Sequence, residues 1–239
     1  MSEILSKVVR IDLGDEVTAN DDTIVVMLHG FGATAQDLVP LAAEIGLFRR
    51  WWFPQAPYPI TVMGMRYGQA WFPRDETAME TAVYGSYFTN LRSLEPRGLT
   101  ESAREIALLL DESRIPPESV VLGGFSQGAM VSAEYARLCL HEGRPLPRAL
   151  LLLSGALIGE RLWRDGASPR PDASRRATAV PVFQSHGRSD TVLPYTEGEA
   201  LREILEQTGF SVRFLPFEGG HEIPGSVVTE VRDVLGTLT

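Results

Sequence analysis

The chain has 239 residues, of which 44% are hydrophobic and 22% are charged, and this composition is typical of a folded globular protein rather than a disordered one. Its formal charge of -9 at pH 7 argues against a nucleic-acid partner, because phosphate binding requires clustered lysine and arginine. The sequence contains no apolar run of about 18 residues and no signal-peptide pattern. We therefore expect no stable membrane insertion and a cytoplasmic location.

Two scarce residue types narrow the chemistry further. Lys7 is the only lysine, so a P-loop, a Schiff base or a Ser-Lys dyad lacks its essential residue. Cys139 is the only cysteine, which excludes an internal disulfide and a cysteine-rich zinc site. Because it lies in an apolar helical pattern, we expect a buried thiol.

Short apolar runs alternate with helical patterns along the chain, which predicts an α/β fold in one domain spanning residues 1–239. Several runs are almost continuously apolar, as is typical of parallel strands covered on both faces. Apolar residues at helical spacing between them predict helices that pack on the sheet. The predicted strands cover residues 7–13, 23–28, 51–53, 119–123, 149–153, 181–185 and 212–216.

Two segments break this alternation. Residues 51–75 contain aromatic side chains that either line a substrate pocket or belong to the core, with Trp71 and Phe72 as the candidate pocket residues. Residues 155–179 are rich in Gly, Pro and charge, and they predict an excursion above the sheet that forms a small flap.

The strongest motif is Gly124-Phe125-Ser126-Gln127-Gly128, which directly follows one predicted strand and precedes a helical pattern. A GxSxG sequence in this setting is typical of a nucleophile elbow, a sharp turn that presents a serine. Glycines flank the serine because only small residues allow the strand and helix to approach so closely. Ser126 is therefore the candidate nucleophile, and a simple tight turn is the alternative.

A serine hydroxyl needs an imidazole to accept its proton. Among the four histidines, only His221 fits the chain order serine, acid, histidine of this fold, and it lies in a loop between the last predicted strand and helix. His29 and His186 end predicted strands and are expected to shape them. We expect His141, at the end of a helical pattern, to be solvated.

The acid that orients this imidazole must lie between Ser126 and His221 in the chain. Asp190 follows the strand predicted at residues 181–185 and is the best candidate, with Glu197 and Asp172 as alternatives. An acid in this position holds the imidazole in the correct tautomer and stabilises the imidazolium.

Attack on a carbonyl also creates an oxyanion, which backbone N–H groups usually bind. The N–H of Gln127 is at the start of a helix, and the loop Leu28-His29-Gly30-Phe31-Gly32 follows a strand in the way an oxyanion loop does. We therefore expect the N–H groups of Phe31 and Gln127 to be the donors.

Several segments together resemble the phospholipase/carboxylesterase family of small α/β-hydrolases, which includes the acyl-protein thioesterases. They are VVMLHGFGATAQDL, FPQAP, AWFP, SVVLGGFSQGAM, LLLSGAL, SHGRSDTVLPY and GGHEIP. The resemblance implies a mostly parallel sheet flanked by helices, little or no lid and no cofactor, with a triad of Ser126, Asp190 and His221. The sequences Trp71-Phe72-Pro73 and His221-Glu222-Ile223-Pro224 are more similar to the bacterial carboxylesterase branch than to the thioesterases.

The leading prediction is a serine carboxylesterase that hydrolyses short to medium acyl esters through an acyl-enzyme intermediate. A lysophospholipase or an acyl-protein thioesterase is the alternative within the same chemistry. A binding protein that keeps the fold without catalysis is the alternative from another class. The expected partner is a small-molecule ester, and a homodimer remains open.

Overall fold

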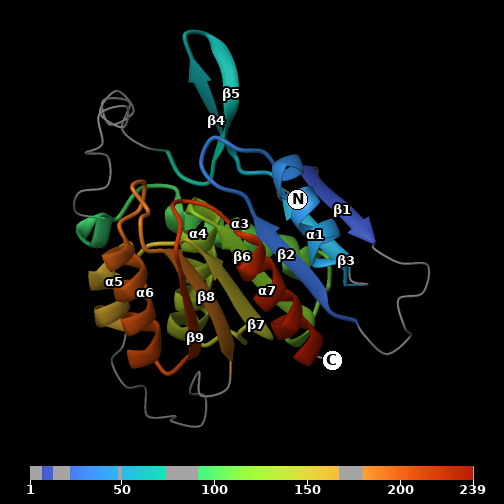
Figure 1. The fold of residues 1–239 in the computed structure, drawn as a ribbon, viewed down its shortest axis with the longest axis vertical. Coiled ribbons are helices and arrows are strands. Elements are labelled where there is room, and N and C mark those ends of the chain that lie inside the picture. The colour runs from blue at the N-terminus through green and yellow to red at the C-terminus, as the bar shows by residue number, and fades with distance from the viewer. Residues whose placement is uncertain (1–6, 13–21, 48–49, 74–90, 167–179, 239) are drawn as a thin grey trace.

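The sheet at the centre of the molecule has seven strands in the spatial order β1-β3-β2-β6-β7-β8-β9 (Figure 1). The structure, a computed structural model, describes residues 7–12, 22–47, 50–73, 91–166 and 180–238. β1 runs antiparallel to β3, and all other neighbouring pairs in this sheet are parallel. The strands are β1 (Val8–Asp12), β2 (Ile24–Leu28), β3 (Arg50–Pro54), β6 (Val120–Phe125), β7 (Ala149–Leu153), β8 (Pro181–Gly187) and β9 (Ser211–Phe217). The predicted α/β-hydrolase type of sheet is confirmed, and every predicted strand is present within two residues at each end.

Helices cover both faces of the sheet because side chains alternate between the faces along each strand. On β2, Val25 and Met27 face one core with α1 and α7, whereas Val26 and Leu28 face the other core with α3, α4 and α6. The α-helices are α1 (Val39–Ile45), α3 (Leu99–Glu112), α4 (Gln127–Glu142), α5 (Glu160–Gly166), α6 (Tyr195–Gln207) and α7 (Gly225–Thr237), and short 3-10 helices cover Ala35–Leu38, Leu91–Ser93 and Pro117–Ser119.

The hairpin of β4 (Tyr58–Val62) and β5 (Met65–Ala70) is an element that the sequence patterns did not predict. It projects from the body at the top of Figure 1. Its two-residue turn, Met63-Gly64, has positive φ at both positions, 50° and 78°, as the hairpin turn of type I′ requires. The one hint of this hairpin in the sequence was Gly64, a glycine between two short segments. Backbone hydrogen bonds from Gly32 N to Gln69 O (2.9 Å) and from Gln69 N to Ala33 O (3.1 Å) tie the hairpin to the loop after β2.

The segment predicted as an excursion, residues 155–179, is described only as far as residue 166. Its described part contains α5, whose Trp163 is buried against the core that includes α4. Residues 167–179 lie outside the described residues, so the predicted flap remains a prediction.

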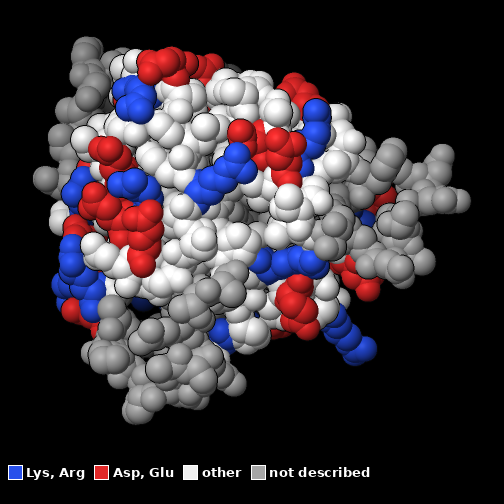
Figure 2. Space-filling view, turned by 60° about the horizontal axis from the view of Figure 1, so that its bottom comes forward, with Lys and Arg blue, Asp and Glu red and all other residues white. Residues whose placement is uncertain are grey.

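Charged side chains of both signs are interspersed on the face shown in Figure 2. Ion pairs also join α3 to the end of α4: Arg104 pairs with Glu142 (3.3 Å), and Arg144, just after α4, pairs with Asp111 (2.7 Å). Within the described ranges, no helix is long and apolar enough to cross a bilayer.

Two fully buried histidines, His29 and His186, hold the loops at the ends of β2 and β8. His29 Nε2 accepts the N–H of Ala56 (3.1 Å), so its Nδ1 carries the proton and donates to Gly30 O (2.8 Å). His186 Nε2 donates to Leu193 O (2.9 Å). Burial lowers the pKa of both imidazoles below the ordinary 6.5, outweighing these carbonyl acceptors. Both rings are therefore neutral in the folded protein at pH 7.

This burial predicts a loss of stability in mild acid. The unfolded chain protonates both imidazoles below about pH 6.5 while the folded protein keeps them neutral, so the unfolded state binds more protons in that range. We expect the free energy of unfolding, measured by urea titration between pH 8 and pH 5, to fall below pH 6.5. The limiting slope is about 1.4 kcal/mol per pH unit for each imidazole.

His141 provides the matched control because it is exposed in the last turn of α4. The variant His141→Asn is expected to keep the same pH dependence of stability. Equal stability of the wild type at pH 5 and pH 8 would contradict the prediction.

Candidate active site

Ser126 occupies the turn between β6 and α4, as the GxSxG motif predicts. Its backbone has φ 56° and ψ -118°, a conformation that costs a non-glycine residue of the order of 1–3 kcal/mol. The turn depends on two glycines. A Cβ on Gly128 would lie 2.0 Å from Leu28 O, and a Cβ on Gly124 would lie 2.4 Å from the Gly128 carbonyl carbon. Only glycine at both positions lets α4 begin this close to the ends of β2 and β6.

The structure brings Ser126, His221 and Asp190 together from the ends of three strands. His221 lies between β9 and α7, and Asp190 follows β8. The Ser126 Oγ to His221 Nε2 distance is 2.8 Å, and the His221 Nδ1 to Asp190 Oδ2 distance is 2.7 Å. The His221 ring also rests on Phe125, with the ring centroids 4.8 Å apart. Serine, imidazole and carboxylate thus form one continuous hydrogen-bonded chain.

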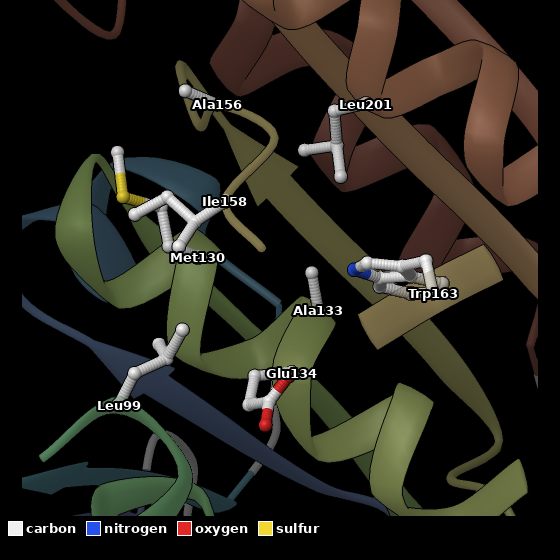
Figure 3. Close-up of a pocket in the computed structure, with 8 residues that line it drawn as sticks. All are labelled: Leu99, Met130, Ala133, Glu134, Ala156, Ile158, Trp163 and Leu201. Atoms are coloured by element: carbon white, nitrogen blue, oxygen red, sulfur yellow. The ribbon is translucent and has the colours of Figure 1, made fainter. Parts of the chain in front are cut away.

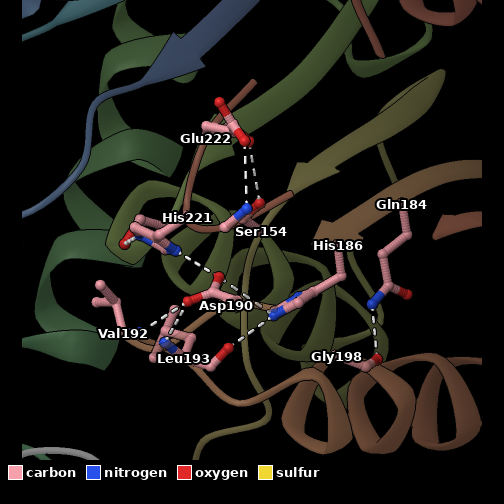
Figure 4. Close-up of polar contacts among 11 residues, drawn as sticks. Ser154, Gln184, His186, Asp190, Val192, Leu193, Gly198, His221 and Glu222 are labelled. Carbon is pink, nitrogen blue, oxygen red and sulfur yellow. Dashed lines mark hydrogen bonds and ion pairs between the residues drawn. The ribbon is translucent and has the colours of Figure 1, made fainter. Parts of the chain in front are cut away.

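The Asp190 carboxylate is enclosed by donors (Figure 4). Its Oδ1 accepts the N–H groups of Val192 and Leu193, both at 2.8 Å, and His186 Nε2 lies 3.4 Å from Oδ2. Burial by itself raises the pKa of Asp190, but the hydrogen bonds from His221, Leu193 and Val192 outweigh it, so the pKa is below its ordinary value. Asp190 is therefore ionised at neutral pH.

This ionised carboxylate determines the tautomer of His221. An ionised carboxylate only accepts hydrogen bonds, so Nδ1 of His221 donates to Asp190. The neutral ring then has its lone pair on Nε2, facing the Ser126 hydroxyl. This arrangement can transfer the hydroxyl proton to the imidazole.

The contact between His186 and Asp190 is a feature that the sequence reasoning missed. His186 was expected only to shape the end of its strand, yet its Nε2 lies near the Asp190 carboxylate as well as the Leu193 carbonyl. The four-residue spacing in SHGRSD was the available signal.

The segments predicted to carry oxyanion donors meet beside Ser126. Gln127 follows it directly, and its N–H is at the start of α4, where helical N–H groups have no acceptor within the helix. The loop after β2 also approaches closely, since a Cβ on Gly30 would lie 3.4 Å from Ser126 Cβ. The peptide that joins Gly30 to Phe31 is thus a near neighbour of Ser126.

Trp71 and Phe72, the two candidate pocket residues, are 0% and 3% exposed. Both belong to the core that includes α3 and α4. The burial favours the core alternative over a pocket wall for both side chains.

Of the two alternative acids, the structure describes only Glu197, and its side chain is paired with Arg92 rather than with His221. Glu197 lies in the first turn of α6 and accepts a hydrogen bond from Arg92 Nε at 3.1 Å. Asp172 lies outside the described residues. Cys139 is buried in α4 as expected, and burial raises its pKa to about 11.

A small pocket lies between α4, α5 and α6 (Figure 3). Its lining is apolar apart from Glu134, whose carboxylate is already held by Arg137 through two contacts of 2.7 Å and by the Thr100 hydroxyl at 2.7 Å. The lining residues are Leu99, Met130, Ala133, Glu134, Ala156, Ile158, Trp163 and Leu201.

Among the residues that the structure describes, no group of three or more His, Cys, Asp or Glu side chains could hold a metal ion.

Comparison with known proteins gives a consistent result. Residues 16–239 match the family described as Phospholipase/Carboxylesterase. Acyl-protein thioesterase 1 of Gibberella zeae is 29% identical over 225 residues, 88% of each chain. A probable carboxylesterase of Oryza sativa is 27% identical over 215 residues, 86% of this chain and 73% of the relative. The crystal structure of Zea mays acyl-protein thioesterase 2 has the same fold, with a TM-score of 0.75 and 24% identity over 97% of this chain and 98% of that one. The chain therefore belongs to the phospholipase/carboxylesterase family and is a serine hydrolase of the α/β-hydrolase fold.

Proposed function

We propose that the protein is a carboxylesterase that hydrolyses short to medium acyl esters, with Ser126 as nucleophile, His221 as base and Asp190 as orienting acid. The observation that carries this proposal is the hydrogen-bonded chain from Ser126 Oγ through His221 to Asp190, with distances of 2.8 and 2.7 Å. The left-handed backbone of Ser126 supports it, because strain of this kind is concentrated at functional sites.

The acylation step follows from this geometry. As Ser126 Oγ bonds to the ester carbonyl carbon, its proton moves to His221 Nε2 and the carbonyl oxygen becomes an oxyanion. The N–H groups of Phe31 and Gln127 are the proposed donors to that oxyanion. When the tetrahedral intermediate collapses, the bond to the alcohol oxygen breaks and the imidazolium gives its proton to the departing alcohol.

Deacylation repeats these steps with water. The oxygen of a water molecule attacks the acyl carbon while His221 takes a proton from that water. The imidazolium then returns a proton to Ser126 Oγ as the bond to the acyl carbon breaks and the carboxylic acid leaves. Asp190 remains ionised throughout and stabilises the imidazolium in both steps. Water supplies the proton of the alcohol and the hydroxyl of the acid, and no atom changes its oxidation state, so the reaction needs no oxidant or reductant.

An acyl thioesterase or lysophospholipase is a second candidate with comparable support. The same nucleophile attacks thioester and ester carbonyls alike, and the relatives include proteins named acyl-protein thioesterase 1 as well as a probable carboxylesterase. The distinction depends on the acyl and leaving groups rather than on the hydrogen-bonded chain.

The cytoplasm is the expected location, and a small ester is the expected partner. A homodimer remains the alternative to a monomer, and light scattering of the purified protein distinguishes the two.

Substitution of the nucleophile is the first test of the proposed function. We expect Ser126→Ala to fold normally and to lower the turnover of p-nitrophenyl butyrate by about 10³-fold or more, because only binding and the oxyanion donors remain. A fluorophosphonate probe should label the wild type and not the variant.

Ser132→Ala is a suitable control, since the hydroxyl of this buried serine of α4 donates within its own helix, to Gly128 O at 2.9 Å. It should keep turnover within about threefold of wild type. A well-folded wild type that the probe does not label would instead support the non-catalytic binding protein.

The acid is tested by comparing carboxylates of similar position in the chain. Asp190→Asn keeps the shape but permits the wrong imidazole tautomer, so kcat is expected to fall by about 10⁴-fold, as in the serine-protease triad. Glu197→Gln removes only a partly exposed ion pair with Arg92, so kcat should stay near wild type. Asp172→Asn is expected to behave like Glu197→Gln. If either of these two is the inactive variant, the acid has been misassigned.

The substrate class is tested with an acyl-chain series. Each added methylene contributes up to about 0.8 kcal/mol only while it is buried, so kcat/KM for p-nitrophenyl esters is expected to peak at short to medium chains. We expect the best of these esters to exceed palmitoyl-CoA and palmitoyl lysophosphatidylcholine by about tenfold or more in kcat/KM. A steep preference for the long-chain thioester would favour the thioesterase alternative.

A further inference from the structure

The peptide groups behind the proposed oxyanion donor Phe31 are held by two buried aromatic side chains, His29 and Trp71. This inference rests on the proposed function, because it concerns the donors of the same site. The Phe31 N–H belongs to the same planar peptide unit as the Gly30 carbonyl. Whatever holds that carbonyl therefore also determines the direction in which the Phe31 N–H points.

The Gly30 carbonyl is held by the ring of His29. Nδ1 of His29 donates to Gly30 O at 2.8 Å, while Nε2 accepts the N–H of Ala56 at 3.1 Å. Ala33 N also donates to Gly30 O, at 3.3 Å. The imidazole thus links the peptide that contains the Phe31 N–H to the segment after β3.

The preceding peptide is held by Trp71. Its indole Nε1 donates to His29 O at 2.8 Å, and the two rings lie 5.4 Å apart between centroids. His29 and Trp71 are both 0% exposed. Because both residues are shielded from solvent, loss of the indole N–H would remove a hydrogen bond from a buried carbonyl, which is costly.

Trp71 is in turn fixed to the nucleophile elbow. The Gln127 carboxamide accepts the Trp71 backbone N–H at 2.8 Å and donates to Phe72 O at 3.0 Å. The Ser102 hydroxyl of α3 donates to Trp71 O. Gln127, whose own N–H is the other proposed donor, is therefore linked through Trp71 and His29 to the peptide that carries the Phe31 N–H.

We propose that Trp71 is a positioning residue for the oxyanion site: its indole N–H holds the His29 carbonyl and so keeps the Phe31 N–H aligned with the Gln127 N–H. Trp71 acts through other residues and does not contact substrate. Aligned N–H donors stabilise the tetrahedral intermediate more than they stabilise the bound ester. Loss of the Trp71 indole N–H should therefore lower kcat and leave KM nearly unchanged.

The test is Trp71→Phe compared with Trp51→Phe. Trp51 is also 0% exposed, but it belongs to the core on the other face of the sheet, and its Nε1 has no hydrogen-bond partner among the described residues. Both substitutions remove the same atoms from a core, so they are expected to destabilise the fold similarly. Only Trp71→Phe removes an indole hydrogen bond.

We expect Trp71→Phe to lower kcat for p-nitrophenyl butyrate by about tenfold or more with KM within about twofold, because misaligned donors weaken oxyanion binding. Butylboronic acid bonds to a serine Oγ as a tetrahedral adduct with an oxygen in the oxyanion site. Its inhibition constant should rise by the same factor as kcat falls. Trp51→Phe should leave kcat, KM and boronate inhibition within about twofold of wild type.

A milder pair of variants keeps the test decisive if Trp71→Phe does not fold. Ser102→Ala removes the hydroxyl that holds the Trp71 carbonyl, whereas Ser185→Ala removes an equally buried hydroxyl without a hydrogen-bond partner in the described structure. Ser102→Ala should lower kcat and weaken boronate inhibition together, and Ser185→Ala should do neither.

The possible failures are distinguishable. Equal effects of Trp71→Phe and Trp51→Phe in an active, probe-labelled enzyme would overturn the inference alone, as would a loss confined to KM with unchanged boronate inhibition. A wild type that neither hydrolyses esters nor reacts with the fluorophosphonate would overturn the proposed function and this inference with it.

Discussion

The contact between the first turn of α4 and the end of β2 is the constraint on which the site depends. Gly128 approaches so closely that any side-chain carbon there would overlap the Leu28 carbonyl oxygen. This approach forces Ser126 into a left-handed backbone conformation, with an estimated cost of about 1–3 kcal/mol. Burial of α4 in the core offsets that cost, since each fully buried large apolar side chain, such as Met130 or Val131, contributes about 1.5–3 kcal/mol. The strained turn persists because the surrounding core leaves α4 no other position.

The site also depends on hydrogen bonding of polar groups that are removed from water. Polar groups without a hydrogen bond are costly in the interior. At the ends of β2 and β8, neutral imidazoles donate hydrogen bonds to buried carbonyl groups. His29 and His186 each hold a carbonyl of the following loop. Asp190, whose side chain is completely buried, keeps its charge because three hydrogen bonds favour the ionised form. His221 is less buried than His29 and His186, and its Nε2 faces the Ser126 hydroxyl.

The hairpin of β4 and β5 illustrates where sequence patterns lose their value. Its strands pair with each other rather than with the central sheet, so they carry no continuous apolar run of the kind that identified β2, β6 and β7. Met63 at its tip is 95% exposed, contrary to the usual position of a large apolar side chain. In its turn only Gly64 is a residue favoured at positive φ, because the usual first residue of such a turn is Asn, Asp or Gly rather than Met63. Trp71, which follows directly, is fully buried although it was a candidate for a pocket wall.

The sequence by itself predicted the chain order of the seven strands of the central sheet, the position of the elbow and the candidate Ser126, because periodicity and glycine spacing act between near neighbours in the chain. It also limited the acid to Asp190, Glu197 or Asp172. The tertiary structure alone decided that Asp190, not Glu197, meets His221, although both follow β8 within ten residues. It alone joined Trp71 to His29, 42 positions away in the chain. Such contacts depend on the strand order of the sheet and on distances near 3 Å, which no local pattern of residues encodes.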